Sequence, residues 1–152
     1  MRISNSVENV REDLRVLLAN TYVIYLKAQK FHWNVEDRQF FSFHSFFEKI
    51  YESLAEAVDS IAERIRTLGY PAPGSFKEFL ELTTLSEAIQ PSYKTDEMLE
   101  ILARDYATLC DFLKQAIRHA GEAGDVGTED FFTERLREHE KDLWMIRSHL
   151  QK

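Results

Sequence analysis

The positions of proline and glycine constrain this chain more than any other feature. Among 152 residues, these two types stand only at Pro71, Pro73, Pro91, Gly69, Gly74, Gly121, Gly124 and Gly127. Because both types interrupt helices, the stretches between them predict long helices. We expect helices over residues 5–33, 39–68, 95–120 and 128–150. The second ends at Gly69, and the fourth opens at Thr128.

Apolar side chains recur in steps of three and four along these stretches, which is the pattern of a helix with one buried face. The first stretch carries Leu14, Leu18, Thr21, Tyr25 and Ala28 and ends on His32. The second carries Phe43, Phe47, Ile50, Leu54, Ile61, Ile65 and Leu68, and the third carries Leu99, Leu102, Tyr106, Leu109, Leu113 and Ile117. The pattern predicts an all-α bundle around one core.

Residues 70–94 form a long connection between the second and third predicted helices. Its segment SFKEFLEL predicts a short helix with Ser75 as the N-cap. A connection of this length can join two parallel helices. Four long helices with one such crossover match the ferritin-like four-helix bundle. We therefore expect one all-α domain over residues 1–152, with a short extra helix in the crossover between helices 2 and 3.

Charge and cysteine content narrow the range of partners. The chain has 26 acidic and 19 basic residues and a net charge of −7, which disfavours a sequence-independent hold on nucleic acid and favours cations. The lone Cys110 excludes an intrachain disulfide and a thiolate metal cluster, so we expect a small core residue. The N-terminal segment MRISNSVENVREDLRVLL has no uninterrupted apolar run, which predicts neither a signal peptide nor a membrane span. We expect a cytoplasmic location.

The second predicted helix carries candidate metal ligands beside its apolar face. At about 100° per residue, five side chains fall within roughly one third of its circumference: His44, Glu48, Glu52, Asp59 and Glu63. His32 ends the inward stripe of the first helix. Carboxylates and imidazoles without thiolates suit iron or manganese, and zinc less specifically. We expect iron, with zinc and manganese as competitors.

These ligands cannot surround one ion within a single chain. His44 and Asp59 are 15 positions apart, which is about 22 Å along a helix that rises about 1.5 Å per residue. The usual di-iron motif of a ferritin-like bundle is also missing, because no glutamate has a histidine three residues after it. A second copy running antiparallel across a two-fold axis would bring His44 beside Asp59 and Glu63 of the partner subunit. The sequence therefore predicts an interface site, repeated on both sides of the axis.

Several of these residues also have a plain structural explanation. His32, between Phe31 and Trp33, fits a hydrogen-bonded core residue. Glu52 and Glu56 fit a solvated helix face. Trp33 fits packing, although an oxidisable ring beside iron can take up a radical. The remaining histidines have no acidic neighbour at ligand spacing that also faces a core, and we expect them at the surface or in caps: His119, His139 and His149.

One part of the chain resembles the signature of a known family. The pattern consists of HWNV at 32–35, Phe40, His44, FE at 47–48, Tyr51, Leu54, Asp59, AERIRTLG at 62–69 and the pair Leu143 and Trp144. It resembles the Dps family, the DNA-binding proteins from starved cells, which are ferritin-like mini-ferritins. The resemblance implies hollow dodecamers built from two-fold dimers. It also implies oxidation of Fe(II) at dimer-interface ferroxidase sites, usually with hydrogen peroxide in preference to oxygen, storage of ferric mineral, and protection of DNA.

The same resemblance implies a role for each candidate ligand. His32 and His44 would come from one subunit, and Asp59 and Glu63 from its two-fold mate. Glu48 would complete a second, weaker iron position. Acidic residues near the start of the fourth helix would line three-fold pores through which iron enters, with Asp130 at the position of the family's pore aspartate: Asp125, Glu129 and Asp130. The alternative for these three is an exposed N-cap cluster.

Two departures from the family pattern affect these expectations. Asp37 stands where many members have glycine, so we expect a different turn with the ligands on either side unchanged. Members that bind DNA directly often carry a lysine-rich N-terminal extension, whereas only Arg2 and Arg11 precede Arg15 here. We therefore expect a ferroxidase and iron-storage cage, rather than a DNA-compacting structural protein or a monomeric helical-bundle adaptor.

Overall fold

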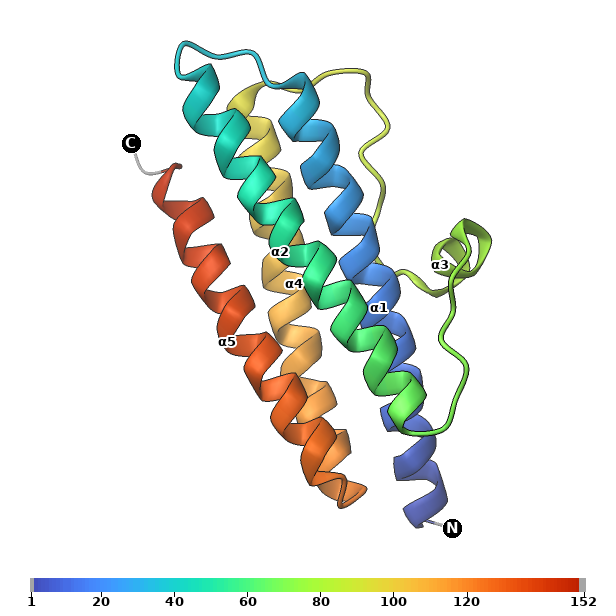
Figure 1. Ribbon diagram of the computed structural model, residues 1–152. Helices are drawn as coiled ribbons and strands as arrows, with labels where there is room; N and C mark the ends of the chain where they lie inside the picture. Colours follow the sequence, from blue (N-terminus) through green and yellow to red (C-terminus); the bar gives the residue numbers. More distant parts are fainter. Residues whose placement is uncertain (1, 151–152) are drawn as a thin grey trace.

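The computed structural model describes residues 2–150, with side chains from residue 5 onward. Five helices cover most of this range: α1 (Arg2–Asn34), α2 (Phe40–Thr67), α3 (Phe76–Leu82), α4 (Thr95–Glu122) and α5 (Val126–Ser148). Residues 2–150 contain no strand. α2 returns alongside α1, α4 runs parallel to α2, and α5 returns alongside α4 (Figure 1). The predicted four-helix bundle with one long crossover is confirmed.

The predicted apolar stripes meet in one core between the four long helices. Leu14 of α1, Leu54 of α2, Leu102 of α4 and Phe132 of α5 are fully buried. Full burial of such a side chain contributes about 1.5–3 kcal/mol, so these stripes hold the bundle together. Cys110 is buried, as predicted. Within residues 2–150, none of the helices combines the length and apolar character that a membrane crossing requires.

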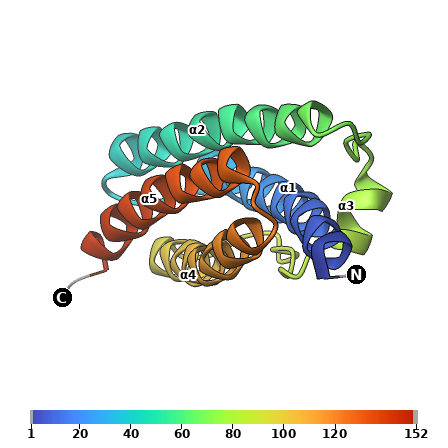
Figure 2. The ribbon, with the colours of Figure 1, turned by 90° about the horizontal axis from the view of Figure 1, so that it is seen from below.

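The crossover lies along α1 and carries α3, which sits outside the four long helices (Figures 1 and 2). Buried Asn20 of α1 anchors it: the side-chain oxygen accepts from Thr83 Oγ1 at 2.6 Å and from the Thr84 amide at 2.9 Å. Further along α1, Lys30 Nζ donates to the carbonyl of Ala88 at 2.6 Å. Side chains of α1 therefore satisfy polar groups of the crossover and hold it against the bundle.

Two predicted helix ends are confirmed. α2 ends at Thr67, and Gly69 follows with φ +95°, a left-handed conformation that glycine adopts at little cost. At the start of α3, the Ser75 hydroxyl accepts from the Glu78 amide at 3.1 Å. This bond satisfies one of the free amides at the helix N-terminus.

The start of α5 differs from the prediction. The helix begins at Val126, two residues before Thr128, because Asp125 is the N-cap and its carboxylate accepts from the Thr128 amide at 3.0 Å. Arg64 of α2 reaches this end, donating to Thr128 Oγ1 at 3.0 Å and to the Asp125 carboxylate at 3.3 Å. A Cβ at Gly127 would lie 2.7 Å from the Arg64 guanidinium, so glycine there makes room for this contact.

The other helix ends deviate by a few residues. α1 begins at Arg2 rather than at residue 5, since no glycine or proline precedes Asn34. α4 continues through Gly121 to Glu122, and Gly124, with φ +69°, follows the turn that ends it. A glycine inside a helix lowers its stability only modestly, so tertiary packing decides such ends. α5 ends at Ser148, two residues before the predicted end.

The prediction that the other histidines lie at the surface or in caps is correct only for His149, the exposed C-cap residue of α5. His119 is half-buried, and its Nδ1 lies 2.6 Å from a carboxylate oxygen of Asp13 on α1. His139 is fully buried, with its ring centroid 5.4 Å from that of Tyr106. The prediction compared neighbours along the chain, whereas these contacts join different helices.

Burial makes His139 a source of acid sensitivity. Desolvation, reinforced by the positive charge of Arg135, lowers the pKa of His139 from 6.5 to about 3. The folded state therefore excludes a proton that the unfolded chain accepts below pH 6.5. The contribution of neutral His139 to the free energy of unfolding is fully present above that pH. It falls as the pH drops towards 3, by about 1.4 kcal/mol per pH unit.

We expect the free energy of unfolding to fall by about 2 kcal/mol more between pH 7 and pH 5 in the wild type than in His139→Gln. Urea unfolding at the two pH values measures this difference. Asp142 acts in the opposite direction, because burial raises its pKa to about 6 and the folded state retains its proton. It is present in both proteins, so the comparison isolates His139. Equal pH dependence in the two proteins would contradict the assignment.

Candidate metal centre

The end of α1 and the start of α2 bring His32 and His44 together. Their imidazole rings stack, with centroids 3.8 Å apart and planes at 16°. Nδ1 of His32 lies 2.8 Å from the backbone oxygen of His44, and Nδ1 of His44 lies 2.7 Å from the backbone oxygen of His32. These reciprocal hydrogen bonds join the two helix ends and fix the orientation of both rings.

The bonding pattern also fixes where each neutral imidazole carries its proton. A backbone carbonyl can only accept, so Nδ1 of each ring must donate. The proton therefore sits on Nδ1, which leaves the lone pair of Nε2 for a metal. His32 is 7% exposed and His44 is half-buried, so the pair lies at the periphery of the bundle rather than inside its core.

Two aromatic rings and one carboxylate surround the histidine pair. Phe40 stacks on His44 with centroids 4.8 Å apart, and Tyr51 meets His32 edge-on at 5.2 Å. Glu48 stands three residues before Tyr51 on α2, so the two side chains lie on the same face of the helix. Desolvation and then the charge of Glu48 raise the pKa of Tyr51. Glu48 is thus linked through Tyr51 to the histidine pair, which suits the predicted accessory position.

Asp59 and Glu63 form a second group of candidate ligands further along α2. Both side chains are exposed, and they are one helical turn apart. A hydrogen bond to Asp59, followed by the negative charge of Asp59, raises the pKa of Glu63. Two carboxyl groups one turn apart on the same helix face can bind one cation between them. Hard oxygen ligands of this kind suit iron or manganese.

The described residues of one chain do not complete a metal site. Residues 2–150 contain no group of three or more histidine, cysteine, aspartate or glutamate side chains that could hold an ion. His44 and Asp59 lie on the same helix, 15 residues apart, or about 22 Å along its axis. The chain therefore carries two candidate half-sites, one with imidazoles and one with carboxylates.

Asp37 explains how the turn between the histidines is held. One carboxylate oxygen accepts from the Gln39 amide at 2.9 Å, and the other accepts from Thr95 Oγ1 at 3.0 Å. The turn is thereby fastened to the first residue of α4. Asp37 thus supplies a specific anchor where a glycine would supply none, and it leaves the histidines on either side in place.

The remaining candidates occupy different environments. Trp33 is 61% exposed, so it is not packed within its own chain. Glu52 and Glu56 are exposed on α2, as a solvated helix face predicts. Tyr51 was not selected by sequence analysis for any chemistry. It stands three residues after Glu48, the spacing at which side chains touch on a helix, and that spacing was the available signal.

The acidic residues near α5 separate into two kinds. Asp125 caps the helix and pairs with Arg64, so the N-cap alternative holds for this residue. The Glu129 carboxylate folds back beside Gly121 of α4, 3.5 Å from the position of a Cβ there. Asp130 is exposed. Of the three, Asp130 is the carboxylate most available to solvent cations.

Comparisons with known proteins identify the family of this chain. The ferritin-like domain family matches residues 11–152. DNA protection during starvation protein 2 of Bacillus anthracis is 34% identical over 143 residues, which are 94% of this chain and 97% of that protein. The structure of Dps from Staphylococcus aureus superposes with a TM-score of 0.90 at 36% identity, covering 94% of this chain and 95% of that one.

The Dps protein of Vibrio cholerae O1 is described as a member of a broad superfamily of ferritin-like diiron-carboxylate proteins. It superposes with a TM-score of 0.91 at 31% identity, covering 97% of this chain and 92% of that one. The fold and the length of the chain coincide with those of these proteins. The chain therefore belongs to the Dps family of ferritin-like proteins.

Proposed function

We propose that this protein is an iron-storing mini-ferritin that oxidises Fe(II) at sites shared between two copies. The observation that carries the proposal is the division of the ligands into two complementary half-sites on one chain. His32 and His44 present free Nε2 atoms, whereas Asp59 and Glu63 present two adjacent carboxyl groups. An antiparallel two-fold partner supplies to each half-site the ligands that it lacks.

The chemistry follows from the ligand types. The carboxylates attract Fe(II) and favour the higher charge of Fe(III), while the neutral imidazoles fill further positions. Acid weakens binding, because protons compete for the same carboxylates and ring nitrogens. With Glu48 supporting a second position, two Fe(II) ions can each give one electron to one hydrogen peroxide. Two protons complete the reaction, which yields two Fe(III) and two water molecules, and no hydroxyl radical leaves the site.

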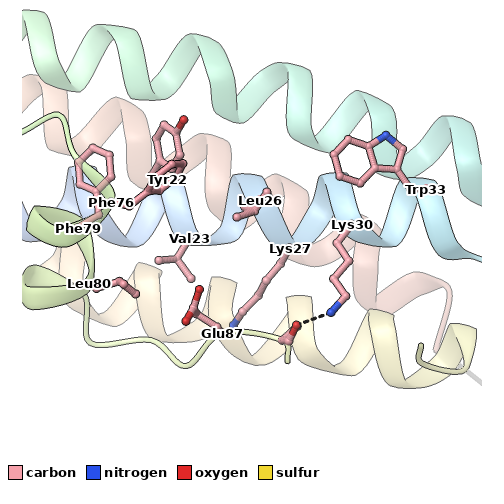
Figure 3. Close-up of a pocket in the computed structure, with 11 residues that line it drawn as sticks. Tyr22, Val23, Leu26, Lys27, Lys30, Trp33, Phe76, Phe79, Leu80 and Glu87 are labelled. Carbon is pink, nitrogen blue, oxygen red and sulfur yellow. Dashed lines mark hydrogen bonds between the residues drawn. The ribbon is translucent and has the colours of Figure 1, made fainter. Parts of the chain in front are cut away.

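A surface beside His32 is suited to receive the second copy. A groove of about 490 Å³ runs between α1 and the crossover with α3, and exposed apolar side chains line it: Leu26, Trp33, Phe76 and Leu80 (Figure 3). Exposed apolar patches on such a scale commonly mark protein interfaces. Because Trp33 directly follows His32, a subunit docked here would lie next to the imidazole half-site. We propose that a second copy of this chain covers the groove.

We further propose that such dimers assemble into a hollow dodecamer that stores the ferric mineral. Glu129 and exposed Asp130 would line three-fold pores through which iron enters, whereas Asp125 is occupied by Arg64. Zinc and manganese would compete at the oxidation site. Removing Fe(II) and peroxide protects nearby DNA, which suits a cytoplasmic protein. At −7 per subunit, direct DNA binding is not proposed.

Anaerobic Fe(II) titration followed by addition of hydrogen peroxide tests the proposal. We expect saturable binding near one or two irons per subunit and rapid formation of ferric absorbance in the wild type. The His32→Ala/Asp59→Ala variant should lose both while keeping its helical content. Oxidation by the wild type that is no faster than in buffer alone would refute the ferroxidase function.

A further inference from the structure

The first turn of α2 places His44, yet it lacks the features that usually hold a helix start. The N-cap residue Gln39 makes no side-chain cap hydrogen bond, and the first turn contains no acidic residue. Phe40 and Phe41 are 44% and 78% exposed, so burial within one chain does little to hold them. A helix start with free amides and no cap frays easily. The start of α2 therefore needs a restraint from outside the helix.

Asp37, two residues before the N-cap, supplies such a restraint. One carboxylate oxygen accepts from the Gln39 amide, and this bond fixes the backbone of the N-cap residue. The other oxygen accepts from Oγ1 of Thr95, which belongs to α4. The negative charge is also favourable beside a helix N-terminus. Asp37 therefore fastens the start of α2 to a different helix.

The α4 end of this connection is firmly held. Thr95 is the first residue of α4 and is 8% exposed, and Met98, one turn further on, is fully buried. The Lys94 amide donates to the Glu97 carboxylate at 2.9 Å, which satisfies a free amide at the start of the helix. The bond from Thr95 therefore restrains the turn relative to a rigid part of the bundle.

The end of α1 is held in another way, by burial. Val35 is 2% exposed, and its amide donates to the carbonyl of Phe31 at 3.0 Å. The ring of Phe31 is fully buried and meets those of Phe47 and Tyr93 edge-on, with centroids 6.0 and 5.7 Å apart. This packing does not extend to residues 36–42, which are all exposed. Of the two histidines, His44 is therefore the one whose position depends on the turn.

We infer, on the basis of the proposed metal-binding function, that Asp37 is a positioning residue whose bond to Thr95 sets how tightly the histidine pair binds a divalent cation. Nδ1 of each histidine is bonded to the backbone of the other helix. Both Nε2 atoms therefore keep their relative placement only while the start of α2 stays in place. A site that is already ordered before the ion arrives loses less conformational freedom on binding, and its affinity is higher.

Anaerobic titration with Co(II) tests this role without any oxidation step, because the visible absorption of Co(II) reports its ligand geometry. Thr95→Val removes the hydroxyl and keeps the shape of the side chain. We expect Co(II) to bind about 3- to 10-fold more weakly to this variant, the effect of one hydrogen bond. Asp37→Ala, at an exposed position, should lose at least as much affinity. Thr95→Ser keeps the hydroxyl and should bind Co(II) as the wild type does.

Thr108→Val is the matched control. Thr108 is an exposed residue of the same helix, and its hydroxyl donates to the Arg104 carbonyl within α4. This variant should keep the wild-type affinity and Co(II) spectrum. Equal loss in Thr95→Val and Thr95→Ser would mean that packing, and not the hydrogen bond, holds the turn, which would overturn the role of Asp37.

The titration also separates this role from the ferroxidase function. Unchanged Co(II) affinity in both Asp37→Ala and Thr95→Val, together with rapid Fe(II) oxidation, would overturn the positioning role alone. Weaker Co(II) binding in both variants, in a protein that does not oxidise Fe(II), would support the positioning role and refute the ferroxidase function. A wild-type protein that binds no Co(II) would overturn both.

Discussion

Replacing Asp59 and Glu63 with asparagine and glutamine should lower the rate of Fe(II) oxidation by about 10- to 100-fold. The variant keeps the size of both side chains but removes the charges that attract the ion and stabilise Fe(III). Stopped-flow ferric absorbance after addition of peroxide measures the rate, and anaerobic titration measures the accompanying loss of affinity.

The Glu52→Gln/Glu56→Gln variant is the matched control for this prediction. It removes two carboxylates with the same spacing from the same helix, where both side chains are exposed to solvent. We expect its oxidation rate to stay close to that of the wild type. An equal loss in both variants would mean that the acidic face of α2 acts only through its total charge, and that Asp59 and Glu63 are not specific ligands.

The largest effect on stability is expected at Asp105. Its carboxylate accepts from Lys27 Nζ at 2.8 Å, and both side chains are almost fully buried between α1 and α4. Asp105→Ala leaves the ammonium group of Lys27 buried without its partner. We expect the free energy of unfolding to fall by about 3–5 kcal/mol, measured by chemical denaturation.

A double variant distinguishes loss of the ion pair from loss of packing. Lys27→Met/Asp105→Leu removes both charges and keeps apolar volume, so it should recover most of the stability lost in Asp105→Ala. Desolvation raises the pKa of Asp105, and the hydrogen bond to Lys27 opposes this rise. Burying the ion pair therefore costs free energy of desolvation. A decrease of less than about 1 kcal/mol in Asp105→Ala would show that water reaches the pair and screens it.

The fold could be predicted because the helical period and the breaker residues are local signals. The stripe from Leu14 to His32 and the cap at Ser75 need no knowledge of other helices. The start of α5 could not be placed as accurately, because Asp125 caps it together with Arg64 from another helix. His139 was misjudged for the same reason, because its surroundings come from the packing of the bundle.

The candidate site also combines features that local spacing predicts with features that arise only from the packing of helices. The proximity of Asp59 and Glu63 follows from their spacing on one helix. The reciprocal bonds between His32 and His44 depend on how α1 and α2 approach each other across a turn, which no periodicity encodes. The separation of imidazoles from carboxylates was visible in the sequence, whereas the contact of Tyr51 with His32 required the structure.

Subunit complementation tests the central claim most directly. One variant, His32→Ala/His44→Ala, and another, Asp59→Ala/Glu63→Ala, should each be inactive alone. In a mixed two-fold dimer, one site combines the intact histidines of one chain with the intact carboxylates of the other. Co-expressed random assemblies should therefore recover roughly one quarter of the wild-type sites and oxidise Fe(II) accordingly. Mixed assemblies that stay as inactive as their parents would show that the ligands do not act across the subunit interface.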